Sequence, residues 1–150
     1  MQVPVHQDPS IGPVDEEELA ELNDNLSEKG CKVDPVFLNY ICQWNGATPH
    51  MTHPSIGKIE RFLNLANSYN PKGGNAAQFN INRVVSQLGN RLPLGFLPFA
   101  ALAHGDLLCI ACSSDGTSSV VKWFNDKQMK HQQLFKDFEL FLRSLNRPNE

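Results

Sequence analysis

The spacing of the apolar residues changes partway along this chain of 150 residues, and that change constrains its fold more than any other feature. In the first half, apolar residues recur at intervals of three and four, as on the buried face of a helix. In the second half, they gather in short runs of branched and aromatic residues separated by turn residues, as in the strands of a sheet. The sequence therefore predicts an α+β fold, with a mixed, mainly antiparallel sheet flanked by helices.

The first predicted helix, over residues 15–29, starts with a capping box. The Asp15 side chain can accept from an early amide, while Glu18 reaches back three residues. Gly30 is placed to end the helix, and a buried stripe is formed by Leu19, Leu22 and Leu26. Because this stripe faces the core, four acids fall on the outer side of the helix: Glu17, Glu21, Asp24 and Glu28.

The charge of the chain is distributed unevenly. Residues 1–30 carry a net charge of −7 and the remainder +4, which gives −3 for the whole chain. A localised negative charge can speed and orient association with a basic partner, although a solvated helix face gives the same pattern. We predict the four outer acids as partner-binding residues. The small net charge argues against a protein that binds nucleic acid.

Two further helices and one weak strand are predicted in the first half. The second helix starts at Pro35 and stops at Gly46. Its buried face consists of Phe37, Tyr40, Ile41 and Trp44. Residues 46–57 have the composition of a loop, and 58–66 that of a strand or partial strand. The third helix covers 76–89, with an apolar face formed by Ile81, Val84, Val85 and Leu88.

Three strands and a closing helix are predicted in the second half. The strands cover residues 96–100, 106–112 and 119–124. The pair Asp115–Gly116 suits a tight turn, so the last two strands should form an antiparallel hairpin. Residues 106–112 are apolar at nearly every position, which predicts a central strand covered on both faces. Residues 131–145 have helical spacing, through Leu134, Phe135, Phe138, Leu142 and Leu145.

The length of the chain suits one domain. We predict a flexible arm over residues 1–14, a single domain over 15–147 and a short tail over 148–150. No stretch approaches the roughly 20 apolar residues of a membrane span, and the start has no secretory leader. We therefore expect a cytoplasmic protein that makes no contact with a membrane.

Four stretches of the sequence match the pattern of a known family. They are the early acidic helix, NYICQWNG, NRLPLGFLPFAALAHGDLLCIAC, and VVKWFND with the terminal FKDFELFLRSL. Together they resemble the SUKH superfamily, the Smi/Knr-type domain of immunity proteins and cell-wall regulators. The third stretch is the most specific, because it repeats the family's Leu-Pro, second Pro and Gly-Asp at Leu92–Pro93, Pro98 and Gly105–Asp106. After Trp123 the chain departs from the pattern, since relatives often have Asp-His where it has Phe124–Asn125–Asp126.

The resemblance implies a SUKH-like fold and, in bacteria, a cytosolic antidote that neutralises a toxin by direct binding. The family's toxins are often nucleases or deaminases, and its fungal members act in cell-wall signalling. Six residues are predicted to have structural roles, in the motif or in the core: Trp44, Gly46, Pro93, Gly105, Asp106 and Trp123. Because exposed loops on a rigid scaffold often carry binding residues, Asp115, Asn125 and Asp126 are further candidates for partner binding.

The four cysteines do not have the arrangement of a reactive site. Cys109 and Cys112 have the spacing Cys-x-x-Cys, but residues i and i+3 of a strand point to opposite faces. Cys31 and Cys42 lie at the edges of helical segments. Because a cytosolic chain normally keeps its thiols reduced, we expect neither a bound metal nor a disulfide.

No other residues have the pattern of a catalytic or cofactor site. The loop histidines lack a further ligand at metal-site spacing: His50, His53 and His104. Ser113 and Ser114 lack a nucleophile elbow, and the diglycine at 72–75 lacks the spacing of a phosphate loop. We therefore expect a non-catalytic protein-binding domain without cofactor, a monomer or weak homodimer whose partner is a cognate toxin or another protein. An intracellular regulatory scaffold and a small-ligand-binding module stay open as alternatives.

Overall fold

The computed structural model describes residues 5–8, 11–31, 35–49, 53, 56–66, 78–112, 118–126 and 130–145. Its α-helices are α1 (Glu16–Glu28), α2 (Pro35–Trp44), α4 (Ile81–Leu88) and α5 (Phe138–Leu145). Its strands are β1 (Val5–His6), β2 (Thr48–Pro49), β3 (Arg61–Phe62), β4 (Phe96–Ala101), β5 (Leu107–Cys112), β6 (Ser118–Trp123) and β7 (His131–Phe135). Short 3₁₀ turns at Gly89–Arg91 and Ala103–Gly105 flank β4. The α+β prediction is confirmed.

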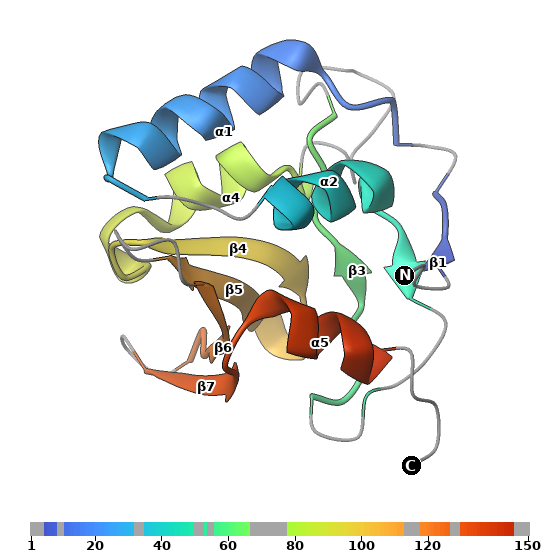
Figure 1. Cartoon of the computed structure of the whole chain (residues 1–150), viewed down its shortest axis with the longest axis vertical. Coiled ribbons are helices and arrows are strands. Elements are labelled where there is room, and N and C mark those ends of the chain that lie inside the picture. The colour runs from blue at the N-terminus through green and yellow to red at the C-terminus, as the bar shows by residue number, and fades with distance from the viewer. Residues whose placement is uncertain are drawn as a thin grey trace.

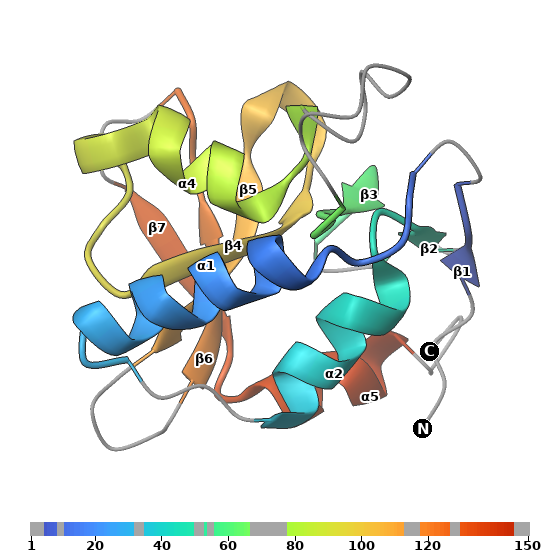
Figure 2. The ribbon, with the colours of Figure 1, turned by 90° about the horizontal axis from the view of Figure 1, so that it is seen from above.

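The main sheet has five antiparallel strands in the order β3-β4-β5-β6-β7, so β5 is the central strand. In both ribbon views α1 lies beside α4, and α2 beside α5 (Figures 1 and 2). Leu108 and Ile110 of β5 belong to a large apolar cluster shared with the helices, whereas Leu107 and Cys109 belong to a smaller one. The predicted central strand, buried on both faces, and its antiparallel hairpin with β6 are confirmed.

Aromatic rings join α2 and α5 to the large cluster. The ring of Trp44 stacks on that of Phe62 with 3.9 Å between centroids. Phe138 meets Phe37 edge to face at 5.0 Å. Trp44 is 2% exposed, and its predicted place in the core is confirmed. Among the described residues, no helix is both long and apolar enough to cross a membrane.

The closing helix is shorter than predicted. Residues 131–135 form strand β7, which pairs with β6, and α5 begins only at Phe138. The Asp137 side chain caps α5 by accepting from the amide of Leu140 at 2.9 Å. Helical spacing at Leu134 and Phe135 was misleading, because two apolar neighbours suit a strand end equally well and pairing with β6 decides the conformation. The prediction of one helix over residues 131–145 is wrong in its first half.

The third predicted helix corresponds to α4, and its predicted first residues, 76 and 77, lie outside the described residues. The Asn80 side chain accepts from the amide of Arg83 at 3.0 Å and so marks the start of α4 at Ile81. Ile81 is fully buried, whereas Val84, Val85 and Leu88 are half-buried. α4 therefore packs at the edge of the core.

A second sheet of two strands joins β1, near the start of the chain, to β2, which follows α2. Val5 pairs with Pro49 and His6 with Thr48, so β2 falls within the stretch predicted as a loop. A Cβ on Gly46, whose φ is +86°, would lie 3.0 Å from Ile11 Cγ1. Asp8 forms a 3.5 Å ion pair with Arg61. Pairing of two residues leaves no periodic signal, which is why the sequence did not predict it.

Candidate interaction surface

Helix α1 presents its acids on one exposed face. The Asp15 side chain accepts from the amides of Glu17 and Glu18 at 2.9 and 3.3 Å, which confirms the predicted cap. Leu22 and Leu26 are buried beneath the helix. Their burial leaves the predicted partner-binding acids exposed: Glu17, Glu21, Asp24 and Glu28. A row of carboxylates on a capped and packed helix is a rigid negative surface.

Glu18 points inward from the same helix and joins it to α4. Glu18 is only 8% exposed. Its Oε2 accepts hydrogen bonds from the side-chain amides of Asn80 and Asn82 at 3.1 and 3.0 Å. The Asn82 amide also donates to the Glu18 carbonyl at 2.8 Å. The backbone amide of Asp15, which Glu18 was expected to cap, donates to the carbonyl of Leu65 at 2.8 Å. Sequence reasoning missed this link because its partners lie more than 60 residues away.

An open polar groove of about 370 Å³ runs between α1 and α4 beside the acidic face. It is lined by Glu18, Glu21, Asn80, Asn82, Arg83, Ser86 and Gln87. Glu21 is common to the groove and to the exposed acidic row. The groove offers carboxylate and amide oxygens to a basic or polar side chain that reaches past the acidic row.

A polar cluster holds together one end of the sheet. The amide of Asn125 donates to Asp106 Oδ1 at 2.9 Å, and its side-chain amide donates to the carbonyl of His104 at 3.3 Å. Arg91 donates to the Asn125 carbonyl at 2.9 Å and to its Oδ1 at 2.6 Å. The Arg91 guanidinium lies 5.5 Å from the ring centre of Trp123. Asp106 thus binds an amide 19 residues away rather than one of its own turn.

The glycine of this cluster is required by its conformation and its neighbour. Gly105 has a φ of +80°, and a Cβ there would lie 2.6 Å from the Asn125 side-chain nitrogen.

Trp123 is 1% exposed, so its predicted place in the core is confirmed. Pro93 is half-buried and its carbonyl accepts from the amide of Phe96 at 3.1 Å.

A model of the SMI1 / KNR4 family (SUKH-1) matches residues 13–144, nearly the whole chain. The chain belongs to this family. No curated protein and no solved structure matches it in the other two comparisons. The Gly105–Asp106 pair, on which the resemblance to SUKH domains partly rested, lies at the centre of the polar cluster.

The loop residues predicted for partner binding in this SUKH-1 domain have different environments. Asp126 is exposed, whereas Asn125 is half-buried and engaged by Asp106, Arg91 and His104. Several candidates of the sequence analysis lie outside the described residues: His50, Ser113, Ser114, Asp115 and residues 72–75. No local pattern singles out Arg91, because it lies 34 residues from Asn125 in the sequence.

The cysteines of the SUKH-1 domain correct one prediction. Cys31 and Cys112 form a disulfide, with their Cα atoms 5.7 Å apart. Cys109 and Cys112 do point to opposite faces, because Cys109 lies in the small cluster and Cys112 packs against the large one. The prediction of no disulfide is wrong because the partner of Cys112 comes from the end of α1, 81 residues away, and not from its own strand.

The described part of the chain contains no group of three or more His, Cys, Asp or Glu residues that could hold a metal ion. Of the histidines considered as ligands or bases, His53 is buried, and this burial lowers its pKa. His104 is exposed and has a φ of +63°, with its carbonyl in the polar cluster.

Proposed function

We propose that this protein is a non-catalytic immunity protein that neutralises a cognate toxin, a nuclease or deaminase, by direct binding in the cytoplasm. Membership of the SMI1 / KNR4 family is consistent with an immunity or regulatory role and suggests protein–protein interaction in general. The observation that carries the proposal is the row of exposed acids on α1, held in place by the buried link from Glu18 to α4.

The proposed mechanism is steric, with electrostatic steering. The acidic row meets a basic surface around the toxin's active or substrate-entry site, and the bound domain blocks that site. Exposed rim charges act mainly on the association rate, and salt screens them beyond roughly 8 to 10 Å. The polar groove beside Glu21 would receive a basic side chain of the toxin.

The test is an association experiment with the toxin encoded beside the gene. The variant Glu17→Gln/Glu21→Gln should associate more slowly, by roughly tenfold at low salt, and with a flatter salt dependence. Dissociation should change little, because the charges lie at a rim. The rates are measured by stopped-flow or surface plasmon resonance across a salt series.

The matched control removes two exposed acids elsewhere, Glu60→Gln/Glu139→Gln, and should leave the association rate unchanged. Equal rates and equal salt slopes for both variants and the unmodified protein would exclude the acidic row as the contact surface. A gene without a toxin neighbour would favour a regulatory scaffold. A stable complex that leaves the toxin fully active would contradict neutralisation itself.

A further inference from the structure

The Cys31–Cys112 disulfide fastens the acidic helix to the sheet. Cys31 lies three residues after the end of α1, and its amide donates to the carbonyl of Leu26 at 2.9 Å. Cys112 is the last residue of the central strand β5. The bond therefore ties the C-terminal end of α1 to the central strand of the sheet, between residues 81 positions apart.

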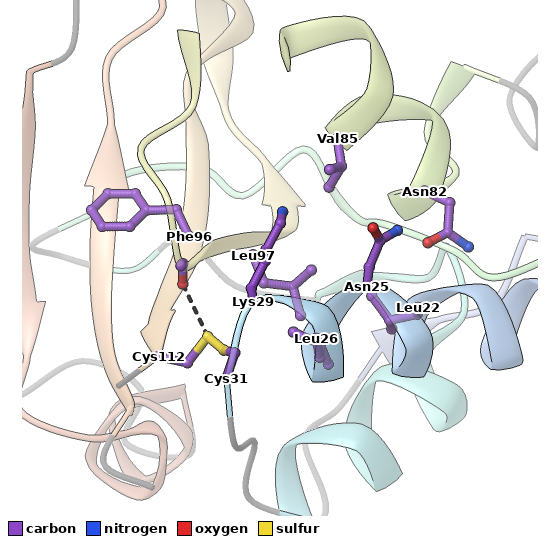
Figure 3. Close-up of a pocket in the computed structure, with 11 residues that line it drawn as sticks. Leu22, Asn25, Leu26, Lys29, Cys31, Asn82, Val85, Phe96, Leu97 and Cys112 are labelled. Atoms are coloured by element: carbon purple, nitrogen blue, oxygen red, sulfur yellow. Dashed lines mark hydrogen bonds between the residues drawn. A yellow bond between two sulfur atoms is a disulfide. The ribbon is translucent and has the colours of Figure 1, made fainter. Parts of the chain in front are cut away.

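The two halves of α1 are held by different contacts. The N-terminal half is joined to α4 by the buried bonds from Glu18 to Asn80 and Asn82. The C-terminal half lies over a narrow pocket of about 10 Å³, room for about one water molecule (Figure 3). Leu22, Asn25, Leu26, Lys29, Asn82 and Val85 line that pocket, together with the disulfide.

The pocket leaves one buried polar atom unmatched. Asn82 is 7% exposed, and its Oδ1 has no hydrogen-bond partner among the described residues. In Figure 3 this oxygen is on the side that faces Asn25. The hydrogen bonds that join α1 to α4 lie at the N-terminal half of α1, whereas the C-terminal half is held by the buried Leu22 and Leu26 and by the disulfide.

The surroundings of Cys112 suit the thiol as well as the disulfide. Its Sγ lies 3.0 Å from the carbonyl oxygen of Gly95 (Figure 3), an acceptor that only the thiol can use because a disulfide sulfur has no hydrogen to donate. Cys112 is also the more accessible member of the pair, half-buried where Cys31 is 9% exposed. Attack by a small thiol is therefore expected at Cys112 rather than at Cys31, and the reduced form has a hydrogen-bond partner in place.

We propose that Cys31 and Cys112 form a reversible thiol–disulfide site that locks the C-terminal half of α1 to the sheet when oxidised and releases it when reduced. This inference goes beyond the proposed function and needs no toxin. It would let the redox state of the cell order or loosen the end of the acidic row that carries Asp24 and Glu28.

The chemistry is exchange with a small thiol such as glutathione. A thiolate attacks Cys112 Sγ, the protein S–S bond breaks, and Cys31 leaves as a thiolate that takes up a proton. A second thiolate attacks the small-molecule sulfur of the mixed disulfide, which releases Cys112 as a thiol and the small disulfide as product. Two small thiols are oxidised, one protein disulfide is reduced, and their two protons end on the cysteines.

The other two cysteines are poor competitors in this exchange. Burial raises the pKa of the Cys109 thiol and, to a smaller extent, that of Cys42. Neither thiol therefore forms the reactive thiolate readily. Cys42→Ser is the matched control for substitution of a cysteine outside the lock.

The test compares the whole protein equilibrated in reduced and in oxidised glutathione. Alkylation and intact mass count the free thiols, thermal unfolding gives Tm, and hydrogen exchange follows α1. Reduction should lower Tm by about 5 to 15 °C and speed exchange in residues 22–31 by about tenfold or more, with the first turn of α1 little changed. Cys42→Ser should respond as the unmodified protein does.

Cys112→Ser separates the lock from a general loss of stability, because its hydroxyl can still donate to Gly95. This variant should behave like the reduced protein in both buffers. The proposal is overturned if the pair stays oxidised in reduced glutathione or stays reduced in the oxidised form. It is equally overturned if Tm changes while exchange in residues 22–31 does not.

Discussion

At the scale of single residues, whether a carboxylate of this chain is buried or exposed depends on the hydrogen-bond donors that the fold places beside it. Glu18 and Glu21 are neighbours on one helix, yet Glu18 is buried against two asparagine amides and Glu21 is exposed. A buried carboxylate keeps its place only when donors satisfy it. Asn80 and Asn82 supply those donors from α4, and so one buried acid positions the exposed ones.

Asp106 offers a prediction at this scale. Asp106→Ala removes the acceptor for the Asn125 amide and should lower the free energy of unfolding by about 1 to 3 kcal/mol. Affinity for the proposed toxin partner, measured on the folded fraction, should hardly change, because the bond lies within the chain. Urea unfolding measures the stability, and Asp126→Ala, an exposed neighbour, should stay within about 0.5 kcal/mol. Lost affinity at unchanged stability would instead place Asp106 in the contact surface.

At the scale of elements, the boundaries follow capping residues more closely than apolar spacing. α1 starts after Asp15, α4 after Asn80 and α5 after Asp137, and each side chain accepts from an amide of the first turn. The predicted helix start at 131 followed the apolar pattern and was too early. A cap is a local hydrogen bond that the sequence can specify, whereas apolar spacing over five residues suits both a helix and a strand.

Helix α5 supports a prediction of this kind. The ring centroid of Phe138 lies 5.0 Å from that of Phe37 and 5.8 Å from that of Phe99, within the large cluster. Phe138→Ala should therefore lower the free energy of unfolding by about 3 to 5 kcal/mol in guanidinium unfolding. Leu140→Ala on the same helix, 41% exposed, should cost far less. Equal losses would mean that α5 does not pack through the face that the structure shows.

At the scale of the whole molecule, the central strand belongs to both apolar clusters. Leu108 and Ile110 contribute to the large cluster, and Leu107 and Cys109 to the small one. Neither cluster can lose its packing without exposing one face of β5, so we expect the chain to unfold as one cooperative unit.

The two tryptophans allow cooperative unfolding to be tested, because Trp44 lies in the large cluster and Trp123 in the small one. Trp44→Phe and Trp123→Phe each leave a single fluorescent reporter. Within each variant, the urea midpoint by fluorescence should coincide with the midpoint by far-UV circular dichroism. Separate midpoints in either variant would show that the clusters unfold independently and that the chain is more than one folding unit.

The sequence by itself determined the class of fold, the central strand, the capped acidic helix and its exposed row. These follow from local caps and from periodicity, which need no knowledge of distant residues. Only the tertiary structure decided the links from Glu18 to α4, from Asp106 to Asn125 and from Cys31 to Cys112. Each of these links joins residues 19 to 81 positions apart. A local sequence pattern does not show which distant residues come into contact when the sheet forms.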